Sequence, residues 1–497
     1  MLRVFLFSTV IFLGFLSCSP KKINSLDSLS LIPYPLKIEN TGGYLPISEL
    51  TTISSTGADS PLVLEMKSFW ETSLVLPLET KTEGRLELKI DSGIEGQEAY
   101  QLQLTEEGVV LRAADEEGLY RAWQSLQQIL VFSKETGKIP TGTITDKSVY
   151  PFRGVMLDVA RHFFTVSEVK RFIDLIALYK FNFLHLHLSD DQGWRIEIKS
   201  WPDLTALSSD SEVGGTQGGF YTQEDYQELV AYAADRFITI IPEIDIPGHT
   251  NAVLHAYPIL NCDGVAPPVH TGIEVGFSSL CVEKPITYQF VEDVIRELAA
   301  ITPGPYLHLG GDETQATPED QFIDFVDKVL PMVNRYGKIP MGWFETRKTN
   351  YKGQVVSQYW AKEADDPEGV RKGNPILMTP SSFAYLDMKY DTLSKHGLFW
   401  AGYTSVQKAY DWSPKTLVPS LPVEDIIGIE AALWSETISD NKGIDYLAFP
   451  RILGHAEIGW TEDELRNWEE YKQRLQKHLV WLRSKGVAYY KSPLLLE

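Results

Sequence analysis

The stretch GVMLDVARHFFTVSEVKRFIDLIALYKFNFLHLHLS, Gly154 to Ser189, has the pattern of a strand, a helix and a second strand in succession. Its two ends, GVMLDVA and FNFLHLHLS, are rich in apolar residues over the length of a strand. Between them Thr165 and Glu168 have the spacing of a capping box, and apolar residues follow at helical intervals. This order is typical of a unit in which the helix joins two parallel strands.

The same alternation continues along the C-terminal two thirds of the chain. A second helix start lies at Thr222 to Asp225. Eight strand candidates are present: GVMLDVA, FNFLHLHLS, FITIIPEIDI, PYLHLGGDE, KIPMGWFE, QVVSQYW, PILMTPSSFAYLD and IGIEAALWSE. Eight strands with intervening helices predict a (β/α)8 TIM barrel, and an open doubly wound sheet is the alternative. No glycine-rich phosphate loop follows any strand, which weakens the nucleotide-binding form of that alternative.

A small α/β domain is predicted to precede the barrel. AYQLQLTEEGVVLRAAD alternates on both sides of Glu106-Glu107-Gly108 and predicts a hairpin, and EEGLYRAWQSLQQIL has apolar residues at helical spacing. We therefore place an N-terminal α/β domain at residues 30–148 and the (β/α)8 barrel at residues 149–497.

The N-terminus resembles a bacterial export signal. MLRVFLFSTVIFLGFLSCSPKK has a basic residue, a short apolar run and Phe15-Leu16-Ser17-Cys18, which resembles a lipobox. We expect a lipoprotein-type signal peptide at residues 1–18, a tether at 19–29 and a lipid anchor on Cys18, so that the protein is exported to the bacterial periplasm or cell surface. An ordinary cleaved signal peptide is the alternative.

Two cysteines remain after export, Cys262 and Cys281. In an oxidising compartment a lone pair is expected to form a disulfide that closes a loop, and two unpaired buried thiols are the alternative.

The overall charge restricts the class of partner. The 497 residues carry a formal net charge of -22, spread along the chain. Nucleic acid and anionic lipid would be repelled over much of such a surface, so we expect neither as a partner. Apart from the lipid anchor, no membrane contact is predicted.

Reactive side chains follow every barrel strand, at the end where barrel enzymes carry their active sites. In strand order they are Asp158, Arg161 and His162; His185, His187, Asp190 and Asp191; Glu243, Asp245 and His249; His308, Asp312 and Glu313; Trp343 and Glu345; Trp360; Tyr385 and Asp387; Trp434 and Glu436. Acids and histidines occupy one half of the ring, and aromatic residues with acids occupy the other.

One enzyme class that this set allows is a metal-dependent barrel amidohydrolase. His185 and His187 lie on one face of a strand and could both bind zinc. In amidohydrolases, however, such a pair lies on the first strand, and later strands add lysine and more histidine. Here the later strands bring mostly Trp and Tyr, so hydrogen bonding inside the barrel explains both histidines better.

The other class is a glycosidase. Aromatic rings stack on the C–H faces of sugars, and carboxylates and Arg bind hydroxyls. The bond also needs a protonated carboxyl and an anion that stabilises an oxocarbenium-like transition state. Asp312 and Glu313 follow the glycines of YLHLGGDET, and neighbouring side chains at a strand end diverge, so one can reach the leaving oxygen while the other lies beneath the ring.

Taken together, the chain resembles glycoside hydrolase family 20, the β-N-acetylhexosaminidases. The resemblance rests on LIPYPLKIE, RGVMLDVARHFF, LHLHLSDDQGWRIEI, EIDIPGHTNA, HLGGDET and LWSETI, in this order. It implies hydrolysis of terminal β-linked GlcNAc or GalNAc with net retention, without a metal or organic cofactor. It also implies that the substrate's own 2-acetamido group attacks through an oxazolinium intermediate, a property known of this family and not deduced from the residues of this chain.

The resemblance assigns catalytic roles to five residues. Glu313 is similar to the general acid and base, and Asp312 to the residue that orients the acetamido group. Tyr385 resembles the tyrosine that binds the acetamido carbonyl oxygen. Asp190 and His249 match a dyad that supports Glu313, although His249 could instead be a helix cap or a packing residue.

It also assigns substrate-binding roles. Three tryptophans are similar to those that wall the acetamido pocket, and four other residues resemble those that hold the terminal sugar: Trp343, Trp360 and Trp434; Arg161, Asp387, Glu436 and Trp400. Trp400 could equally be a core residue, and Asp191 could be only a salt-bridge partner of Arg195. The Cys262–Cys281 pair is also found in similar members of the family.

A non-catalytic carbohydrate-binding lipoprotein is the remaining alternative. The complete set of acids and aromatic residues argues against it.

Overall fold

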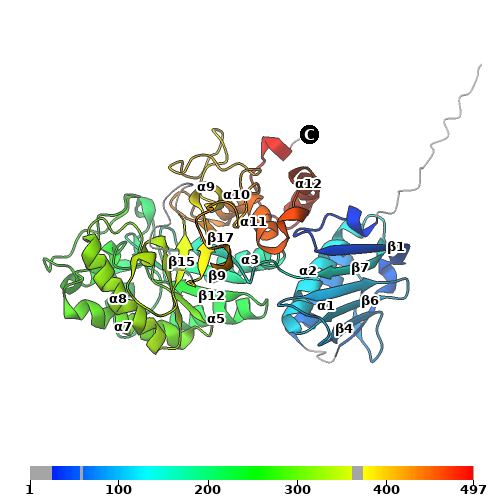
Figure 1. Cartoon of the computed structure of the whole chain (residues 1–497), viewed down its shortest axis with the longest axis horizontal. Helices are drawn as coiled ribbons and strands as arrows, with labels where there is room; N and C mark the ends of the chain where they lie inside the picture. Colours follow the sequence, from blue (N-terminus) through cyan, green and yellow to red (C-terminus); the bar gives the residue numbers. More distant parts are fainter. Residues whose placement is uncertain (1–24, 56–59, 361–372, 496–497) are drawn as a thin grey trace, which may run out of the picture.

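A computed structural model describes residues 25–55, 60–360 and 373–495. They form two parts that lie side by side, a small α/β domain and a large barrel (Figure 1). The predicted signal peptide and Cys18 lie outside the described residues. No helix in the described ranges combines the length and the apolar character that a membrane crossing requires.

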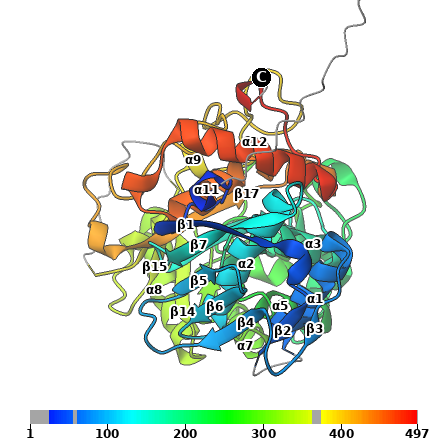
Figure 2. The same cartoon turned by 90° about the vertical axis from the view of Figure 1, so that its right-hand side faces the viewer.

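The N-terminal domain is built on one seven-stranded sheet. The strands, in spatial order, are β1 (Lys37–Pro46), β7 (Lys138–Asp146), β5 (Tyr100–Leu104), β6 (Val109–Ala113), β4 (Leu86–Ile90), β2 (Thr52–Ser54) and β3 (Glu79–Thr80). The predicted hairpin is confirmed, because β5 and β6 are antiparallel and pair Tyr100 with Ala113. The predicted helix is α2 (Glu116–Ser133), and α1 (Pro61–Phe69) packs against it where Phe69 meets Trp123. Figure 2 views the molecule from the side of this sheet.

The second part is a closed barrel of eight parallel strands. In barrel order they are β8 (Phe152–Asp158), β9 (Phe183–His187), β12 (Thr239–Glu243), β13 (Tyr306–His308), β14 (Ile339–Trp343), β15 (Val356–Tyr359), β16 (Ile376–Met378) and β17 (Ile426–Leu433). Each strand overlaps one of the eight predicted segments, and β17 pairs with β8 to close the ring. The predicted (β/α)8 barrel is therefore confirmed, and the open sheet is excluded.

Helices surround the barrel and extend from it (Figure 1). They are α3 (Val166–Ala177), α4 (Asp203–Ser208), α5 (Gln223–Ala234), α6 (Asn251–Ala256), α7 (Pro285–Ile301), α8 (Glu319–Arg335), α9 (Ser381–Ala384), α10 (Asn441–Ala448), α11 (Arg451–Trp460) and α12 (Trp468–Ser484). A short ribbon of β10 (Ser189–Asp190) and β11 (Gly193–Trp194) follows β9.

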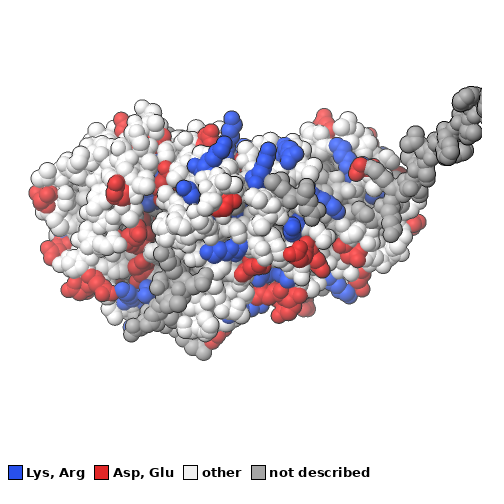
Figure 3. Space-filling model, turned by 90° about the horizontal axis from the view of Figure 1, so that it is seen from above, with Lys and Arg blue, Asp and Glu red and all other residues white. Residues whose placement is uncertain are grey.

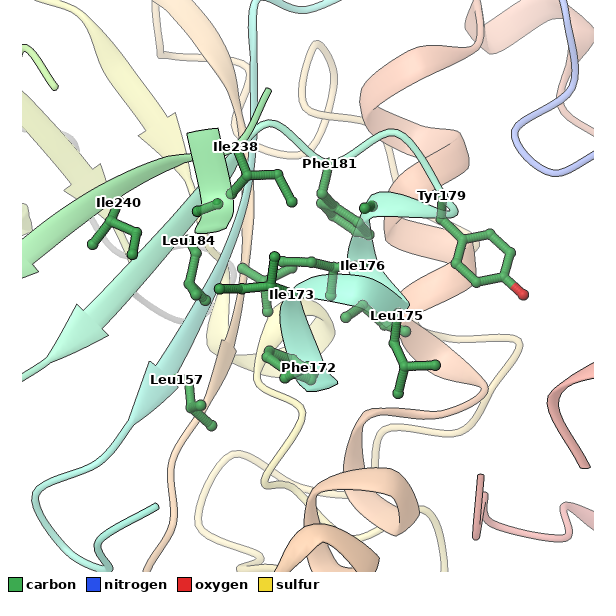
Figure 4. Close-up of a cluster of buried hydrophobic side chains, with 14 of the residues drawn as sticks. Leu157, Phe172, Ile173, Leu175, Ile176, Tyr179, Phe181, Leu184, Ile238 and Ile240 are labelled. Carbon is green, nitrogen blue, oxygen red and sulfur yellow. The ribbon is translucent and has the colours of Figure 1, made fainter. Parts of the chain in front are cut away.

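Helix α3 illustrates how the sequence pattern becomes packing. Both hydrogen bonds of the predicted capping box at Thr165 and Glu168 are present. The buried face of the helix meets β8 and β9, so that Phe172 and Ile173 lie near Leu157 and Leu184 (Figure 4). Full burial of each such side chain stabilises the fold by about 1.5–3 kcal/mol.

Buried ion pairs join the N-terminal domain to the barrel. Glu98, just before β5, contacts Arg121 of α2 and Arg153 of β8, and all three side chains are almost fully buried. Asn182 also donates to Glu98, at 3.1 Å. Burial alone would raise the pKa of Glu98, but the two guanidinium groups lower it to about 2. This cluster lies where β8 and β9 begin, at the opposite end of the barrel from the predicted site.

The C-terminal helix adds a second connection. Arg474 of α12 donates to the carbonyl oxygen of Leu31 at 2.7 Å, so the last helix holds the segment that leads into β1. On the face shown in Figure 3, acidic and basic side chains are interspersed over the surface.

Candidate active site

The carboxyl ends of the barrel strands enclose a cavity of about 490 Å³. Nine predicted site residues line it: Arg161, Asp312, Glu313, Trp360, Tyr385, Asp387, Trp400, Trp434 and Glu436. The other three, Asp190, His249 and Trp343, are buried behind this lining and contact it. The structure thus brings all twelve into one site.

The turn after β13 sets the two adjacent acids at different depths. Gly310 and Gly311 have φ values of 61° and 96°, a region that suits glycine. A Cβ on Gly310 would lie 1.8 Å from Oδ1 of Asp245, so no larger residue fits there. Beyond the turn, the side chain of Asp312 is 12% exposed and that of Glu313 is 32% exposed. Asp312 is therefore the deeper group and Glu313 the more accessible one.

His249 lies between the two acids. Its Nε2 is 3.6 Å from Oε2 of Glu313 and 3.9 Å from Oδ2 of Asp312. Its Nδ1 is 3.2 Å from Oδ1 of Asp190. Burial alone would lower the pKa of His249, but the carboxylates of Asp190 and Asp245 raise it well above its usual value. His249 is therefore a cation beside the acids, and neither a helix cap nor a simple packing residue.

Asp190 connects His249 to Arg161, which lines the cavity. Its Oδ2 accepts from Arg161 Nη2 at 2.7 Å and from His187 Nε2 at 2.9 Å. Burial would raise the pKa of Asp190, but Arg161 and His249 hold it well below the usual range. One permanently charged carboxylate thus holds both Arg161 and His249.

Two other buried carboxyl groups, those of Asp312 and Asp245, have raised pKa values, in contrast to Asp190. The pKa of Asp312 is raised to about 6, chiefly by burial and further by the charges of Glu313 and Glu243, although His249 opposes the shift. Burial and the charge of Asp312 raise the pKa of Asp245 well above its usual value. Asp245 therefore holds a proton more firmly than an exposed aspartate does.

Aromatic side chains form the wall next to Asp312. The rings of Trp434 and Tyr385 are 6.1 Å apart, and the ring of Trp343 lies 5.6 Å from that of Trp434. Trp343 is fully buried and donates to Glu243 at 2.8 Å, so it supports the wall and does not face the cavity. Burial, followed by the charge of Asp312, raises the pKa of Tyr385 well above its usual value, so its hydroxyl keeps its proton.

Trp360 and Trp400 continue the wall outward. Trp360 donates to Oε2 of Glu345 at 3.1 Å, and its ring centre is 6.3 Å from that of Trp400. Trp400 lines the cavity and is 45% exposed, so the suggestion that it is a core residue is wrong.

The floor of the cavity carries polar groups that face inward. Arg161 stacks on Trp434, with its Cζ 4.7 Å from the ring centre. Both carboxylate oxygens of Asp387, Oε2 of Glu436 and Nε1 of Trp434 are buried without a hydrogen-bond partner among the described residues. Burial raises the pKa of Glu436 to about 7, although Arg161 opposes the shift. Buried polar atoms of this kind require partners, and the hydroxyl groups of a ligand in the cavity would supply them.

The two barrel histidines are held by carboxylates, as the sequence pattern predicts. Nδ1 of His187 is 2.7 Å from Glu243, and Nδ1 of His185 is 3.0 Å from Glu430. Four groups of His and carboxylate side chains in the described residues lie close enough together to hold a cation: His185, Glu243 and His308; His187, Asp190 and Asp245; Asp190, Asp191 and His249; Asp245, His249 and Asp312. Chelation therefore remains a necessary test of any mechanism.

The proposed salt bridge between Asp191 and Arg195 is wrong. Arg195 donates to main-chain carbonyl oxygens instead, among them those of Ala160 and Ser209. Asp191 accepts from the main chain of Asn251 at 2.9 Å and from the hydroxyl of Ser278. Asp191 therefore fixes the loop after β12, next to His249.

The predicted disulfide is confirmed, because Cys262 and Cys281 are bonded. They close a loop whose residues Ile273 and Val275 line the cavity, together with Leu398 and Phe399. Sequence reasoning missed these four residues, since isolated apolar residues in loops carry no pattern. It also gave no role to Asp245, although its position after a strand was a usable signal.

Comparisons with known proteins agree with this geometry. Two family models match the chain: "Glycosyl hydrolase family 20, catalytic domain" over residues 150–463 and "Glycosyl hydrolase family 20, domain 2" over residues 28–147. The chain is 40% identical to a beta-N-acetylhexosaminidase of Cellulomonas fimi, over 94% of this chain and 97% of that protein. It is 31% identical to a beta-hexosaminidase of Porphyromonas gingivalis, over 96% of this chain and 67% of that protein.

Solved structures that resemble this chain are also β-hexosaminidases. A mutant Streptomyces plicatus beta-hexosaminidase in complex with the product GlcNAc has a TM-score of 0.90 and 42% identity, covering 94% of this chain and 97% of that one. The beta-N-acetylhexosaminidase of Bacteroides fragilis has a TM-score of 0.80 and 28% identity, covering 93% of this chain and 97% of that one.

Proposed function

Since this chain belongs to glycosyl hydrolase family 20 and is a β-hexosaminidase, we propose that it acts from the chain end and retains the anomeric configuration. Its substrate is a terminal β-linked GlcNAc or GalNAc residue, and the nucleophile is the 2-acetamido group of that residue. The observation that carries this proposal is the unequal placing of the two acids, with Asp312 buried against the aromatic wall and Glu313 exposed at the cavity entrance.

The first step cleaves the glycosidic bond. Glu313 gives its proton to the leaving oxygen while the bond from C1 to that oxygen breaks and takes its electron pair with it. The acetamido carbonyl oxygen forms a bond to C1 on the opposite face. Asp312, as a carboxylate, accepts the N–H of the acetamido group and stabilises the positive charge of the resulting oxazolinium ion.

The second step adds water to the oxazolinium ion and restores both the acetamido group and the protonated Glu313. Glu313, now a carboxylate, takes a proton from water while the water oxygen attacks C1. The bond between C1 and the acetamido oxygen breaks, and its electron pair returns to the carbonyl group. Two inversions at C1 give net retention.

The aromatic wall supports the internal attack. The rings of Trp360 and Trp434 exclude water from the acetamido group, and the Tyr385 hydroxyl, which keeps its proton, donates to the carbonyl oxygen. At the floor, the unpartnered oxygens of Asp387 and Glu436 accept hydroxyl groups of the terminal sugar. Because these groups close the inner end of the cavity, only a chain end enters.

An aryl β-N-acetylglucosaminide assay tests the proposal and separates it from a non-catalytic carbohydrate-binding lipoprotein. We expect Glu313→Gln to bind substrate and lose most of its turnover, and Asp312→Asn to lose roughly 10²–10³-fold in kcat. Wild-type cleavage of the matching β-glucoside should be negligible, because it lacks the nucleophile. Equal cleavage of the two substrates would contradict the acetamide mechanism.

Chelation provides the second control, since no step requires a metal or organic cofactor. We expect activity to survive EDTA. Loss of activity that zinc restores would instead support the amidohydrolase alternative.

We also propose that the protein is exported and anchored to a bacterial membrane through Cys18, on the support of its lipobox-like sequence. Radiolabelled palmitate should enter the wild type and not Cys18→Ala. Equal labelling of both would overturn the anchor.

A further inference from the structure

The leaving group of the proposed reaction occupies the entrance side of the cavity. It must lie beside Glu313, because that side chain gives it a proton. The disulfide-closed loop borders this side, since a Cβ on Gly276 would lie 3.3 Å from the main-chain oxygen of Glu313 and 2.0 Å from Oε1 of Gln315. Ile273 and Val275 of the same loop line the cavity there.

The entrance is apolar on both sides. Ile273, Val275 and Phe399 are 48%, 43% and 53% exposed, although each lines the cavity that holds the acids. The polar groups of Arg161 and Asp387 lie deeper in the same cavity, where these residues are 5% and 1% exposed. A leaving group at the entrance therefore meets aliphatic and aromatic surface.

The loop that carries Ile273 and Val275 is fixed in place. The Cys262–Cys281 bond closes its base. Within it, Gly272 accepts from the Gln192 side chain and Thr271 accepts from the main chain of Gly214, both at 2.9 Å. The apolar surface is thus preorganised, and a ligand gains its contact area without ordering the loop.

We propose that Ile273, Val275 and Phe399 form a leaving-group subsite that selects apolar surface and does not distinguish hydroxyl patterns. The enzyme consequently tolerates different linkages to the leaving sugar and favours a leaving group with a large apolar face. This inference rests on the proposed function, because it needs the cleaved bond to lie at Glu313.

Alkyl glycosides isolate the contribution of apolar contact with the leaving group. Methyl and octyl β-N-acetylglucosaminides release alcohols of similar basicity, so their difference reports contact and not bond strength, provided that octyl glycoside stays below its micellar concentration. We expect kcat/KM to be at least roughly tenfold higher for the octyl compound, which corresponds to burial of about two methylene groups.

Variants at the entrance test which residues cause the preference for the octyl compound. Val275→Thr keeps the side-chain volume and replaces a methyl group with a hydroxyl, and Phe399→Ser removes the aromatic face. Each should lower the octyl-to-methyl ratio, and the double variant should lower it further than either single variant. Leu393→Ser is the matched control, because Leu393 is exposed but does not line the cavity, and it should keep the wild-type ratio.

Disaccharides test the insensitivity to hydroxyl pattern. We expect β-1,4- and β-1,6-linked GlcNAc disaccharides to differ by less than about tenfold in kcat/KM, whereas a site that hydrogen-bonds a specific hydroxyl rejects its absence by roughly 10⁴-fold. A wild-type octyl-to-methyl ratio near one, entrance variants with the wild-type ratio, or strong linkage discrimination would each overturn the inference while leaving the proposed function intact. No hydrolysis of any N-acetylglucosaminide, the aryl compound included, would overturn both.

Discussion

At the scale of single residues, Asp312 combines two opposing demands. Its proposed role requires a carboxylate, but burial favours the neutral acid and raises its pKa to about 6. The unionised fraction of the free enzyme therefore grows as the pH falls through about 6, and the acetamido N–H then loses its acceptor.

We predict that kcat/KM for an aryl N-acetylglucosaminide decreases below about pH 6, approaching tenfold per pH unit. The decrease occurs on the acid side because the deprotonated form of Asp312 is the active one. In kcat this decrease should occur at lower pH, because the acetamido N–H of the bound substrate donates to the carboxylate and so lowers the pKa of Asp312. A kcat/KM that stays constant down to pH 5 would show that Asp312 ionises normally.

The sequence predicted which residues reach the site, but it did not predict how deeply each of them lies. A reactive residue just after a barrel strand is predictable, because all eight strands end at one face. Depth depends on the register of neighbouring strands and on packing. The family resemblance accordingly places Trp343 in the cavity wall, whereas the structure places it behind the wall, and the contact of Asp245 with Asp312 has no counterpart in the sequence pattern.

At the scale of elements, the turn after β13 is tightly constrained. Gly310 has a positive φ and no room for a Cβ beside Asp245, whose Oδ1 in turn accepts from the main chain of Gly311 at 2.9 Å. The position of Asp312 thus depends on a glycine two residues before it.

We predict that Gly310→Ala lowers kcat by about 10²-fold or more, because displacement of reacting groups by about 1 Å has this effect. Gly337→Ala is the matched control, since Gly337 also has a positive φ, 75°, but a Cβ added there would meet no other atom within 4 Å. It should lose only about 1 kcal/mol of stability and keep its kcat. Equal kcat losses in the two variants, or none in Gly310→Ala, would refute the steric argument.

Elements with a strong period were predictable, and irregular segments were not. The eight strands, α3 and α5 follow from apolar periodicity and capping boxes, which are local properties. The apolar surface of Ile273 and Val275 arises only because a disulfide-closed loop returns to the cavity, and no local pattern records that return.

At the scale of the whole molecule, buried charge holds the two domains together. Glu98 lies between Arg121 and Arg153 at the domain boundary, where none of the three side chains has appreciable exposure. Removal of the shared carboxylate would leave the buried guanidinium of Arg153 without its counter-ion and that of Arg121 with Glu117 alone.

We predict that Glu98→Gln lowers the free energy of unfolding by about 3–5 kcal/mol, as for other broken buried pairs. The exposed Glu95→Gln is the control and should change it by less than about 0.5 kcal/mol. Denaturant unfolding of the full chain provides the measurement, and a Glu98→Gln variant as stable as the control would contradict the role of the cluster.

The pH dependence of the same pair gives an independent check. Because the pKa of Glu98 is lowered to about 2, its contribution is present above pH 4.5 and is lost as the pH falls from 4.5 towards 2. Burial raises the pKa of Glu117 to about 7, which works in the opposite sense, so the relevant quantity is the difference between wild type and Glu98→Gln. That difference should shrink over this acidic range.

The two-domain organisation was predictable from the change in sequence pattern, but the junction was not. Glu98, Arg121 and Arg153 look like surface charges in the sequence, and only the fold brings them from three distant segments to one buried point.

Asp190 has a consequence for selectivity. One of its oxygens binds the guanidinium of Arg161, which lines the cavity, and the other binds His249, which lies beside Glu313. The Asp190 carboxylate therefore links Arg161, which is proposed to bind the terminal sugar, to His249, which lies beside the proposed proton donor Glu313. An epimer whose hydroxyls draw Arg161 out of line also disturbs the cation beside the acid, so the wrong sugar can bind well and still react slowly. Discrimination between epimers should accordingly appear in kcat more than in KM.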